Sequence, residues 1–255
     1  MFDAGMLTNV NFTHGVYTVN MRGVTVKGVT VKGVTVPKNA YHHGDLRNAL
    51  VLTAVRLIED DGIGEFSLRA AAREVGVSAN AAYRHFNDKS DLLSAVAAHG
   101  FEKLAQRMRR AMNAARDGKG PAKLAVNRFK ATGRAYVQFA LAHPDLFEVM
   151  FGRNGAITVA PGDPAEDEAG TYALLGSAID DLVSSGVLAA SRRPGAELNA
   201  WVTVHGFARL CLDGAAKLPP GSTRADALED LLDFIVAGIC GSSRNPESKR
   251  HDDSA

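Results

Sequence analysis

The sequence predicts an all-α protein in which an N-terminal helix-turn-helix domain of three helices is joined by a long helix to a C-terminal helical bundle. Apolar residues recur at helical spacing from about residue 45 to residue 241, and the short segments between these runs contain Gly or Pro. Residues 68–86, LRAAAREVGVSANAAYRHF, place two short helical runs on either side of Gly76. These patterns favour helices packed on helices over any sheet.

Composition limits the class of protein. The chain has 255 residues, of which 46% are hydrophobic, enough for a packed core. Its longest apolar runs, such as 234–240, are far shorter than the ~20 residues that cross a bilayer, and no secretory signal pattern opens the chain. Cys211 and Cys240 have no Cys or His at metal-binding spacing, so we expect free thiols. We expect a cytoplasmic protein with no membrane partner, metal site or cofactor.

Residues 1–40 differ from the rest of the chain. Residues 23–36 read GVTVKGVTVKGVTV, whose alternation suggests a strand but whose glycines and isolation argue against a stable one. We expect a disordered extension over 1–40, an acidic loop over 162–170 and a disordered tail over 242–255. The net charge is only +1, yet the start of the chain is basic. Residues 22–47 contain a single acidic residue, Asp45, and five basic residues, namely Arg22, Lys27, Lys32, Lys38 and Arg47.

The first three helices follow from local signals. Leu46, Leu50, Ala54, Leu57 and Ile58 share one face of a helix that begins near residue 45 and ends at the glycines of positions 62 and 64. Ser67 is placed to cap a helix over 68–75, Gly76 turns the chain, and Ser78 is placed to cap a third helix through Phe86. We assign residues 41–92 to this first domain.

A long helix is predicted over 89–116 and ends at DGKGP, residues 117–121. The second domain, 93–241, then continues with helices over 121–143, 144–151, 171–185, 195–217 and 223–241. The last helix has a wide apolar stripe, which is either ordinary core or a subunit interface. The stripe consists of Leu228, Leu231, Leu232, Ile235, Val236 and Ile239.

Two helices around a Gly-centred turn, with a short second helix, are the arrangement that places the second helix in the major groove of DNA. Ala79, Ala81 and Ala82 leave that helix almost bare, so its backbone can approach base edges. Asn80 has the donor and acceptor pair that reads adenine, and Tyr83 and His85 can donate to phosphates. The alternative is a helical hairpin inside a metabolic enzyme, where small residues only allow tight packing.

The segment 45–93, with FSLRAAAREVGVSANAAYRHFNDKSDLL at its centre, closely resembles the DNA-binding domain of the TetR family of bacterial transcriptional regulators. The Gly-Val-Ser turn, the Tyr-x-His-Phe end and the following Lys carry this resemblance. In the second half, WVTVHG at 201–206 resembles the Trp-x-x-x-His-Gly signature of one C-terminal ligand-binding class of that family, and HPDLFEVMF at 143–151 is of the same kind.

The resemblance implies roles for particular residues. Residues at helix starts and around the end of the recognition helix would contact phosphates, namely Ser67, Ser78, Tyr83, His85 and Lys89. Ala79, Asn80 and Ala81 would face the bases, although many relatives have Gly-Thr-Leu before the Tyr, so the readout there differs. The family is dimeric through its last two long helices, so we expect a homodimer on a palindromic operator in double-stranded DNA.

An apolar bundle with a few inward polar groups is the usual form of a small-molecule site. Its candidate lining residues are Phe129, Tyr136, Phe147, Met150, Phe151, Trp201 and His205, for each of which ordinary core packing is the alternative. Trp201 and His205 lie four residues apart and so project from one helical face. His205 would hold a buried hydrogen bond or sense an acid group of the ligand, and we expect a small hydrophobic effector.

Two other classes of function were weighed. An enzyme is disfavoured because His42, His43 and Asp45 have no second cluster to complete a metal site, and no nucleophile elbow or phosphate loop occurs. An architectural DNA binder would need a second domain without a pocket. We expect a repressor whose effector changes the spacing of two DNA-binding heads. The coupling would pass through 89–116, the only predicted element that joins head to bundle, and Leu232 and Ile235 would lie in the dimer interface.

Residues 16–20, VYTVN, precede Met21, and their codons can be written GTT TAC ACT GTA AAC. GTTTAC and GTAAAC are reverse complements with centres about one helical turn, ~10 bp, apart, as a two-fold dimer requires. One interpretation is that residues 1–20 are operator DNA read as protein, with translation beginning at Met21 or at a later Val codon such as Val36. The other is a translated basic arm whose codons permit the palindrome by accident.

Overall fold

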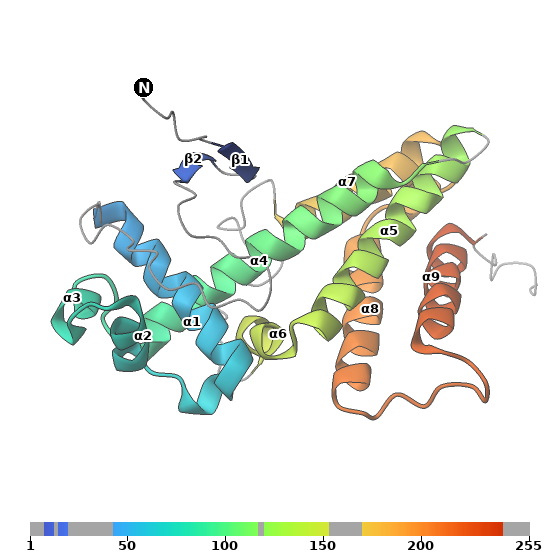
Figure 1. The fold of residues 1–255 in the computed structure, drawn as a ribbon. Helices are drawn as coiled ribbons and strands as arrows, with labels where there is room; N and C mark the ends of the chain where they lie inside the picture. The colour runs from blue at the N-terminus through green and yellow to red at the C-terminus, as the bar shows by residue number, and fades with distance from the viewer. Residues whose placement is uncertain (1–7, 13–14, 20–42, 117–119, 153–169, 242–255) are drawn as a thin grey trace, which may run out of the picture. The chain divides into compact units, whose positions relative to one another are not determined.

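The computed structural model describes residues 8–12, 15–19, 43–116, 120–152 and 170–241 (Figure 1). The chain divides into two units, residues 1–42 and 43–255. The GVTVK repeat, most of the acidic loop and the C-terminal tail lie outside the described residues. In the second unit every regular element of the described residues is a helix, which confirms the predicted all-α fold there.

The first unit contains two short antiparallel strands, β1 (Thr8–Phe12) and β2 (Gly15–Val19). Their register pairs Val10 with Tyr17 and Asn11 with Val16. We expected no regular structure over 1–40, and the pairing of 8–12 with 15–19 differs from that expectation. Alternating β-branched residues on both sides of a two-residue connection are typical of a hairpin, a signal that we sought only in the GVTVK repeat.

The helices of the second unit follow the predicted order. They are α1 (His43–Glu65), α2 (Leu68–Val75), α3 (Ala79–Tyr83), α4 (Lys89–Ala114), α5 (Pro121–Ala142), α6 (Pro144–Phe151), α7 (Thr171–Ser184), the 3-10 turn η1 (Ala190–Arg192), α8 (Ala196–Leu212) and α9 (Arg224–Cys240). Gly62, at φ 82°, interrupts the helical backbone of α1 close to where the sequence predicted its end.

Side-chain caps fix the ends of α2 and α3. The Ser67 hydroxyl accepts a hydrogen bond from the Ala70 amide at 3.1 Å, and the Ser78 hydroxyl accepts one from the Ala81 amide at 3.2 Å. Between them Gly76, at φ 83°, turns the chain in the left-handed region that favours glycine. The third helix ends at Tyr83 rather than at Phe86, which is buried and belongs to the core.

Two groups of contacts connect the DNA-binding head to the bundle. The helix α4 runs from the head into the bundle and packs against α5, α6 and α7 (Figure 1). In addition α1 packs against α6, and the Nδ1 of His143 lies 2.7 Å from the Oε1 of Glu59. The prediction that the long helix alone joins the two parts was therefore wrong. The reason is that Pro144 starts a new helix whose direction brings it against α1.

The apolar stripe of α9 faces the interior of its own chain. Leu228, Leu232, Ile235 and Ile239 are buried, and a Cβ built on Gly133 of α5 would come within 2.5 Å of Leu232 Cδ2. The prediction that Leu232 lies in a dimer interface was wrong, because this side chain is buried against α5 of its own chain. Ile235 is also buried, but it lines a groove between α8 and α9, so its place in an interface stays a prediction. Within the described residues, the large apolar side chains left exposed on α8 and α9 are Leu198, Val202, Leu210 and Phe234.

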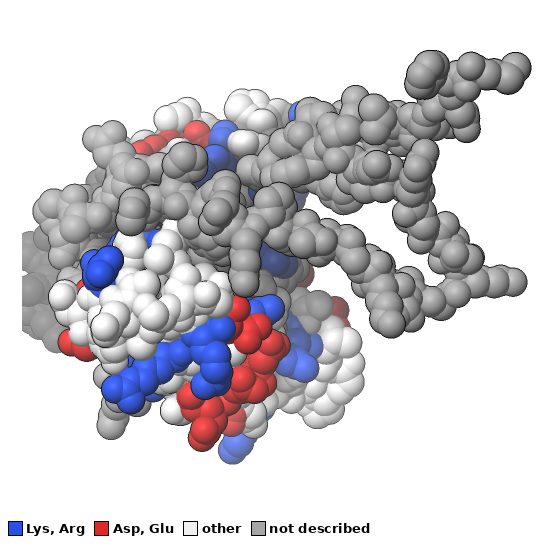
Figure 2. All heavy atoms as spheres, turned by 60° about the vertical axis from the view of Figure 1, so that its left-hand side comes forward, with Lys and Arg blue, Asp and Glu red and all other residues white. Residues whose placement is uncertain are grey.

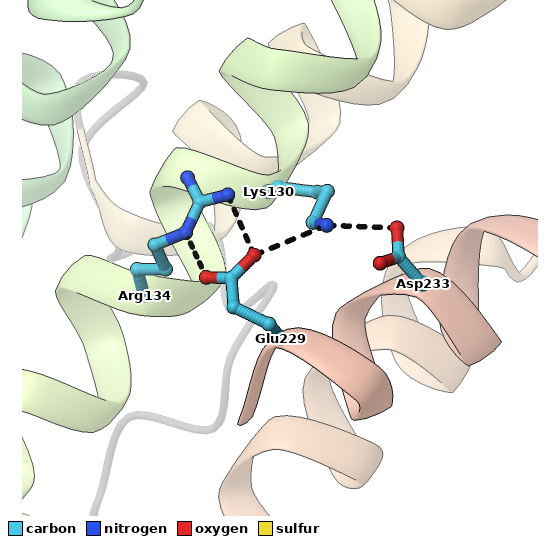
Figure 3. A network of polar contacts seen from close by, with 4 residues as sticks. All are labelled: Lys130, Arg134, Glu229 and Asp233. Carbon is cyan, nitrogen blue, oxygen red and sulfur yellow. Dashed lines mark hydrogen bonds and ion pairs between the residues drawn. The ribbon is translucent and has the colours of Figure 1, made fainter. Parts of the chain in front are cut away.

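Ion pairs hold α9 against α5 (Figure 3). The Lys130 side chain is largely buried, and its amine lies 2.7 Å from Asp233 and 3.1 Å from Glu229. Arg134 makes a two-pronged contact with the same Glu229 carboxylate. The hydrogen bond from Arg134, with help from Lys130, lowers the pKa of Glu229 to about 2. This carboxylate therefore stays charged and keeps the two helices together at any pH near neutral.

Candidate functional site

The α2–α3 pair presents a bare face. Ala79 and Ala81 are partly exposed, Asn80 is exposed, and Ala82 is buried against the core of the head. Tyr83 closes α3 with 43% of its surface exposed, and His85 follows it partly buried. The small side chains and the exposed amide thus lie on the same helix, as the sequence predicted.

Three exposed arginines lie on the same pair of helices, Arg69 and Arg73 on α2 and Arg84 directly after α3. Figure 2 shows that Lys and Arg gather in a band on the forward face of the molecule, next to a band of acidic residues. The motif alone did not indicate these arginines as phosphate contacts, although their positions on α2 and after α3 were an available signal. Exposed cations on a helix-turn-helix are suited to a polyanion.

Lys89 has neighbours within its own head. Its amine donates a hydrogen bond to the Ile63 carbonyl at 3.0 Å and lies 5.6 Å from the centre of the Phe66 ring. The side chain is exposed as a whole, but its amine ties the start of α4 to the end of α1. A contact with phosphate would have to share this amine with the Ile63 carbonyl.

The bundle contains a cavity of about 30 Å³. A single water needs ~10–15 Å³ on this measure, so the cavity holds about two waters, and a larger ligand requires side chains to move. Its walls come from α4, α5, α6, α7, α8 and α9. The lining residues are Phe101, Met108, Phe129, Thr132, Gly133, Tyr136, Phe151, Thr171, Tyr172, Leu175, Ala200, Trp201, Val204, Leu232 and Ile235.

The predicted ligand-binding residues fall into two groups. Phe129, Tyr136, Phe151 and Trp201 line the cavity. Phe147, Met150 and His205 do not: Phe147 and Met150 are fully buried, and Met150 packs where a Cβ on Gly100 would meet its sulfur at 2.6 Å. The sequence analysis missed Phe101 and Met108 because it sought lining residues only beyond residue 121, and their apolar spacing on the long helix was the available signal.

His205 stands behind the cavity wall in a cluster of aromatic rings. Its ring stacks on Phe147 at 5.5 Å and meets the Phe151 ring edge-on at 4.9 Å. Its Nδ1 lies 2.8 Å from the Tyr136 hydroxyl, which also accepts a hydrogen bond from the Trp201 indole at 3.4 Å. Burial, with a contribution from nearby Arg209, lowers the pKa of His205, so the ring is neutral near pH 7.

The same burial raises the pKa of Tyr136 far above its ordinary value, so this hydroxyl also stays neutral. With a neutral His205, the short contact is an O–H of Tyr136 donating to an unprotonated Nδ1, which leaves the ring proton on Nε2. The arrangement is a partly buried hydrogen-bond chain from Trp201 through Tyr136 to His205, of which Trp201 and Tyr136 line the cavity.

Two family profiles match the chain. Residues 50–96 match the profile described as "Bacterial regulatory proteins, tetR family", and residues 129–235 match "Tetracyclin repressor-like, C-terminal domain". This chain belongs to the TetR family. It is therefore a DNA-binding transcriptional regulator and not an enzyme. The finer likeness to the Trp-His-Gly class stays a prediction.

Solved structures agree with the fold. A protein of unknown function from Rhodococcus sp. RHA1 is 32% identical, with a TM-score of 0.63, and the match covers 78% of this chain and 98% of that one. A TetR family transcription regulator from Marinobacter aquaeolei VT8 is 20% identical, with a TM-score of 0.53 and coverage of 76% and 94%. The fatty acid degradation regulator FadR from Bacillus halodurans is 16% identical, with a TM-score of 0.52 and coverage of 78% and 96%. None of the curated proteins matches the sequence.

Further chemistry was sought in the rest of the described chain. There, no helix is long and apolar enough to span a membrane. Among these same residues no group of His, Cys, Asp and Glu is arranged to hold a metal ion. Cys211 and Cys240 are free thiols, as predicted, each partly buried.

Proposed function

We propose that this TetR-family regulator is a one-component, cytoplasmic repressor whose homodimer leaves a palindromic operator when a small hydrophobic effector enters the cavity of the bundle. In this proposal residues 41–92 bind DNA and residues 93–241 bind the effector and the second subunit. The observation that carries it is that Phe101 and Met108, which line the cavity, stand on α4, the helix that begins in the DNA-binding head.

The DNA contacts proposed here divide by chemistry. Ser67, Ser78, Tyr83, His85 and Lys89 would position the head on phosphates, with Arg69, Arg73 and Arg84 adding to the salt-dependent attraction. Ala79, Asn80 and Ala81 would lie against base edges, where Asn80 alone offers a donor and acceptor pair. Phosphate contacts fix position and affinity, and Asn80 would contribute to sequence preference.

The proposed dimer uses the exposed faces of α8 and α9. Leu198, Val202 and Leu210 repeat at helical spacing on α8, and Phe234 on α9 is 71% exposed. A groove lined by Arg192, Ala196, Asn199, Thr203, Phe234, Ile235, Gly238 and Ile239 lies between the two helices. A two-fold interface would place this surface against its own copy. Large exposed apolar side chains on neighbouring helices support such a contact.

Effector entry would act on two elements. A ligand larger than two waters must displace lining side chains, and those of α4 and α6 include Phe101 and Phe151, whose rings meet edge-on at 5.2 Å. The helix α6 contacts α1 through the Glu59–His143 pair. A ligand shifts the head only by its different affinity for the two arrangements, so both contacts are candidates for the coupling.

The test is DNA binding by the purified chain. The DNA fragment is the one that precedes its own gene, titrated by fluorescence anisotropy with and without a panel of small apolar molecules. The proposal expects specific binding that at least one apolar molecule weakens. If the protein binds this DNA specifically and no molecule that binds the cavity changes the DNA affinity, the result would favour an architectural DNA binder. The presence of a cavity disfavours that alternative.

A further inference from the structure

The walls of the bundle cavity contain no charged side chain among the described residues that line it. They include three aromatic hydroxyl or indole groups and two threonines, and all other lining residues are apolar. Thr132 donates its hydroxyl proton to the Phe129 carbonyl at 2.7 Å, so it is satisfied within α5. An ionised ligand group placed here would lose its water without gaining a counter-ion.

Two groups that follow Trp201 on α8, His205 and Arg209, are already engaged. Arg209, one turn beyond His205 on α8, pairs with Glu148 at 2.6 Å and with Asp213 at 3.4 Å. His205 does not line the cavity, and its Nδ1 is occupied by Tyr136. The two alternatives for His205 were a buried hydrogen bond and a sensor of an acid group, and the geometry supports the hydrogen bond.

The indole of Trp201 is a polar lining group whose hydrogen bond is long. Its N–H donates to Tyr136 over 3.4 Å, at the long end of a hydrogen bond, whereas the Tyr136–His205 contact is short at 2.8 Å. A ligand oxygen could take over the indole N–H while the Tyr136–His205 bond stays intact. An indole N–H only donates, so the matching ligand group is an acceptor.

We infer that the effector is a neutral, largely apolar molecule with one carbonyl oxygen, such as a ketone, ester or lactone, which accepts a hydrogen bond from the Trp201 indole, and that carboxylates are excluded. This inference rests on the proposed effector site. The cavity must widen to admit such a molecule, and the flexible side chains of Met108 and Leu232 are among its walls.

The experiment uses Trp201 as its own reporter, because it is the only tryptophan of the chain. The full-length protein is titrated at pH 7 with two matched sets of probes. The aliphatic set is 2-octanone, octanoate and 1-octene, and the aromatic set is acetophenone, benzoate and styrene. Trp201 emission and the melting temperature are both followed.

The expected result is a saturable emission change and a raised melting temperature with at least one ketone, and neither with its carboxylate at tenfold higher concentration. In Trp201→Phe, followed by melting temperature, the ketone should lose about five- to tenfold in affinity while the alkene of the same set changes little. Tyr136→Phe, which keeps the indole, should retain the ketone preference.

Gly133→Ala supplies a variant with a blocked cavity. The added methyl group would displace the Leu232 side chain toward the cavity that it lines, so ketone binding should be lost while the fold and DNA binding remain. Three results would overturn the inference: carboxylates that bind as well as ketones, a Trp201→Phe loss equal for ketone and alkene, or no binding by either ketone. Ketone binding that leaves DNA affinity unchanged would support the ligand class and count against the repressor mechanism.

Discussion

Lys89 illustrates how one side chain can be shared between the fold and the proposed DNA contact. Its amine donates to the Ile63 carbonyl at the end of α1 and lies over the ring of Phe66, which follows α1. The motif alone assigned it to phosphate. The structure adds that the same amine keeps the start of α4 in register with the end of α1.

We predict that Lys89→Ala lowers both DNA affinity and the stability of the head. Loss of one phosphate contact should reduce the slope of log affinity against log salt by about 0.9, equally for all DNA sequences. The matched variant Asn80→Ala should keep that slope and change discrimination at one base position by ~1–3 kcal/mol. A salt slope in Lys89→Ala equal to that of the original protein would show that Lys89 serves the fold only.

The carboxylate of Glu229 gives a prediction about pH. Its pKa is lowered to about 2 by Arg134 and Lys130, whereas in the unfolded chain it titrates near 4.3. Between these two pKa values the carboxylate of Glu229 binds a proton more readily in the unfolded chain than in the folded one. The contribution of its ion pairs to the free energy of unfolding is therefore fully present above about pH 4.3 and is lost as the pH falls toward about 2.

Glu229→Gln should therefore lower the free energy of unfolding at pH 7 and flatten its fall between pH 5 and pH 3, as measured by urea denaturation. Asp230→Asn, which changes an exposed carboxyl on the same helix, is the control and should retain the original profile. Identical acid profiles for Glu229→Gln and the original protein would contradict the assignment.

At the scale of elements, local signals predicted helix positions well. The bounds of α2 and α6 were predicted exactly as 68–75 and 144–151, because Ser67, Gly76 and Pro144 mark them in the sequence itself. By contrast α8 ends at Leu212 and not near Lys217, because Gly214 adopts a φ of 66° and the Ala215 amide donates back to the Leu210 carbonyl at 2.8 Å. A glycine inside an apolar run is compatible with either a helix or its end, so the sequence pattern favoured the longer helix.

The faces of helices were harder to predict than their bounds. The apolar stripe of α9 is wide enough to face either the core or a partner, and the positions of α5 and α8 determine that Leu232 faces inward. For the cavity, the aromatic residues of the bundle were recognised, but their division into lining and core depended on packing between helices distant in sequence. Phe147 and Phe151 stand on the same short helix, yet only Phe151 lines the cavity.

The contact between α1 and α6 leads to a prediction about coupling. Glu59→Gln removes the charge of the Glu59–His143 pair but can keep its hydrogen bond. Since the pair is partly exposed, we expect a small but measurable decrease in the ligand-induced loss of DNA affinity, of at most ~1 kcal/mol or about fivefold. Ligand affinity of the free protein should not change.

The measurement compares DNA affinity with and without a saturating ketone from the probe panel. Asp60→Asn, an exposed neighbour on α1, is the control and should respond to the ketone like the original protein. An unaltered response in Glu59→Gln would leave α4 as the route of coupling.

For the whole molecule, the proposed dimer makes a prediction that separates interface from core. Phe234→Glu places a charge on the exposed face of α9 and should yield a folded monomer by light scattering, with helical content kept. Leu232→Ala opens the core instead and should lower stability by about 2–5 kcal/mol while the dimer persists. A dimer of Phe234→Glu as tight as that of the original protein would exclude this face.

The gene provides the test for the first twenty residues. If the five codons of residues 16–20 spell the inverted repeat, the operator interpretation expects this DNA to bind the protein specifically. It also expects the intact mass of the native protein to begin at Met21 or later. A native mass that includes Met1 would show that this segment, with its paired strands, is translated.

The alanines of α3 have a consequence for how this regulator can diverge. Ala79 and Ala81 are partly exposed, while the buried Ala82 and the Ser78 cap hold the helix in place. Mutations at positions 79 and 81 therefore add side chains on the outside without disturbing the packing beneath. After gene duplication, a copy could acquire a new operator preference through these positions while it kept its effector, its partner surface and its stability.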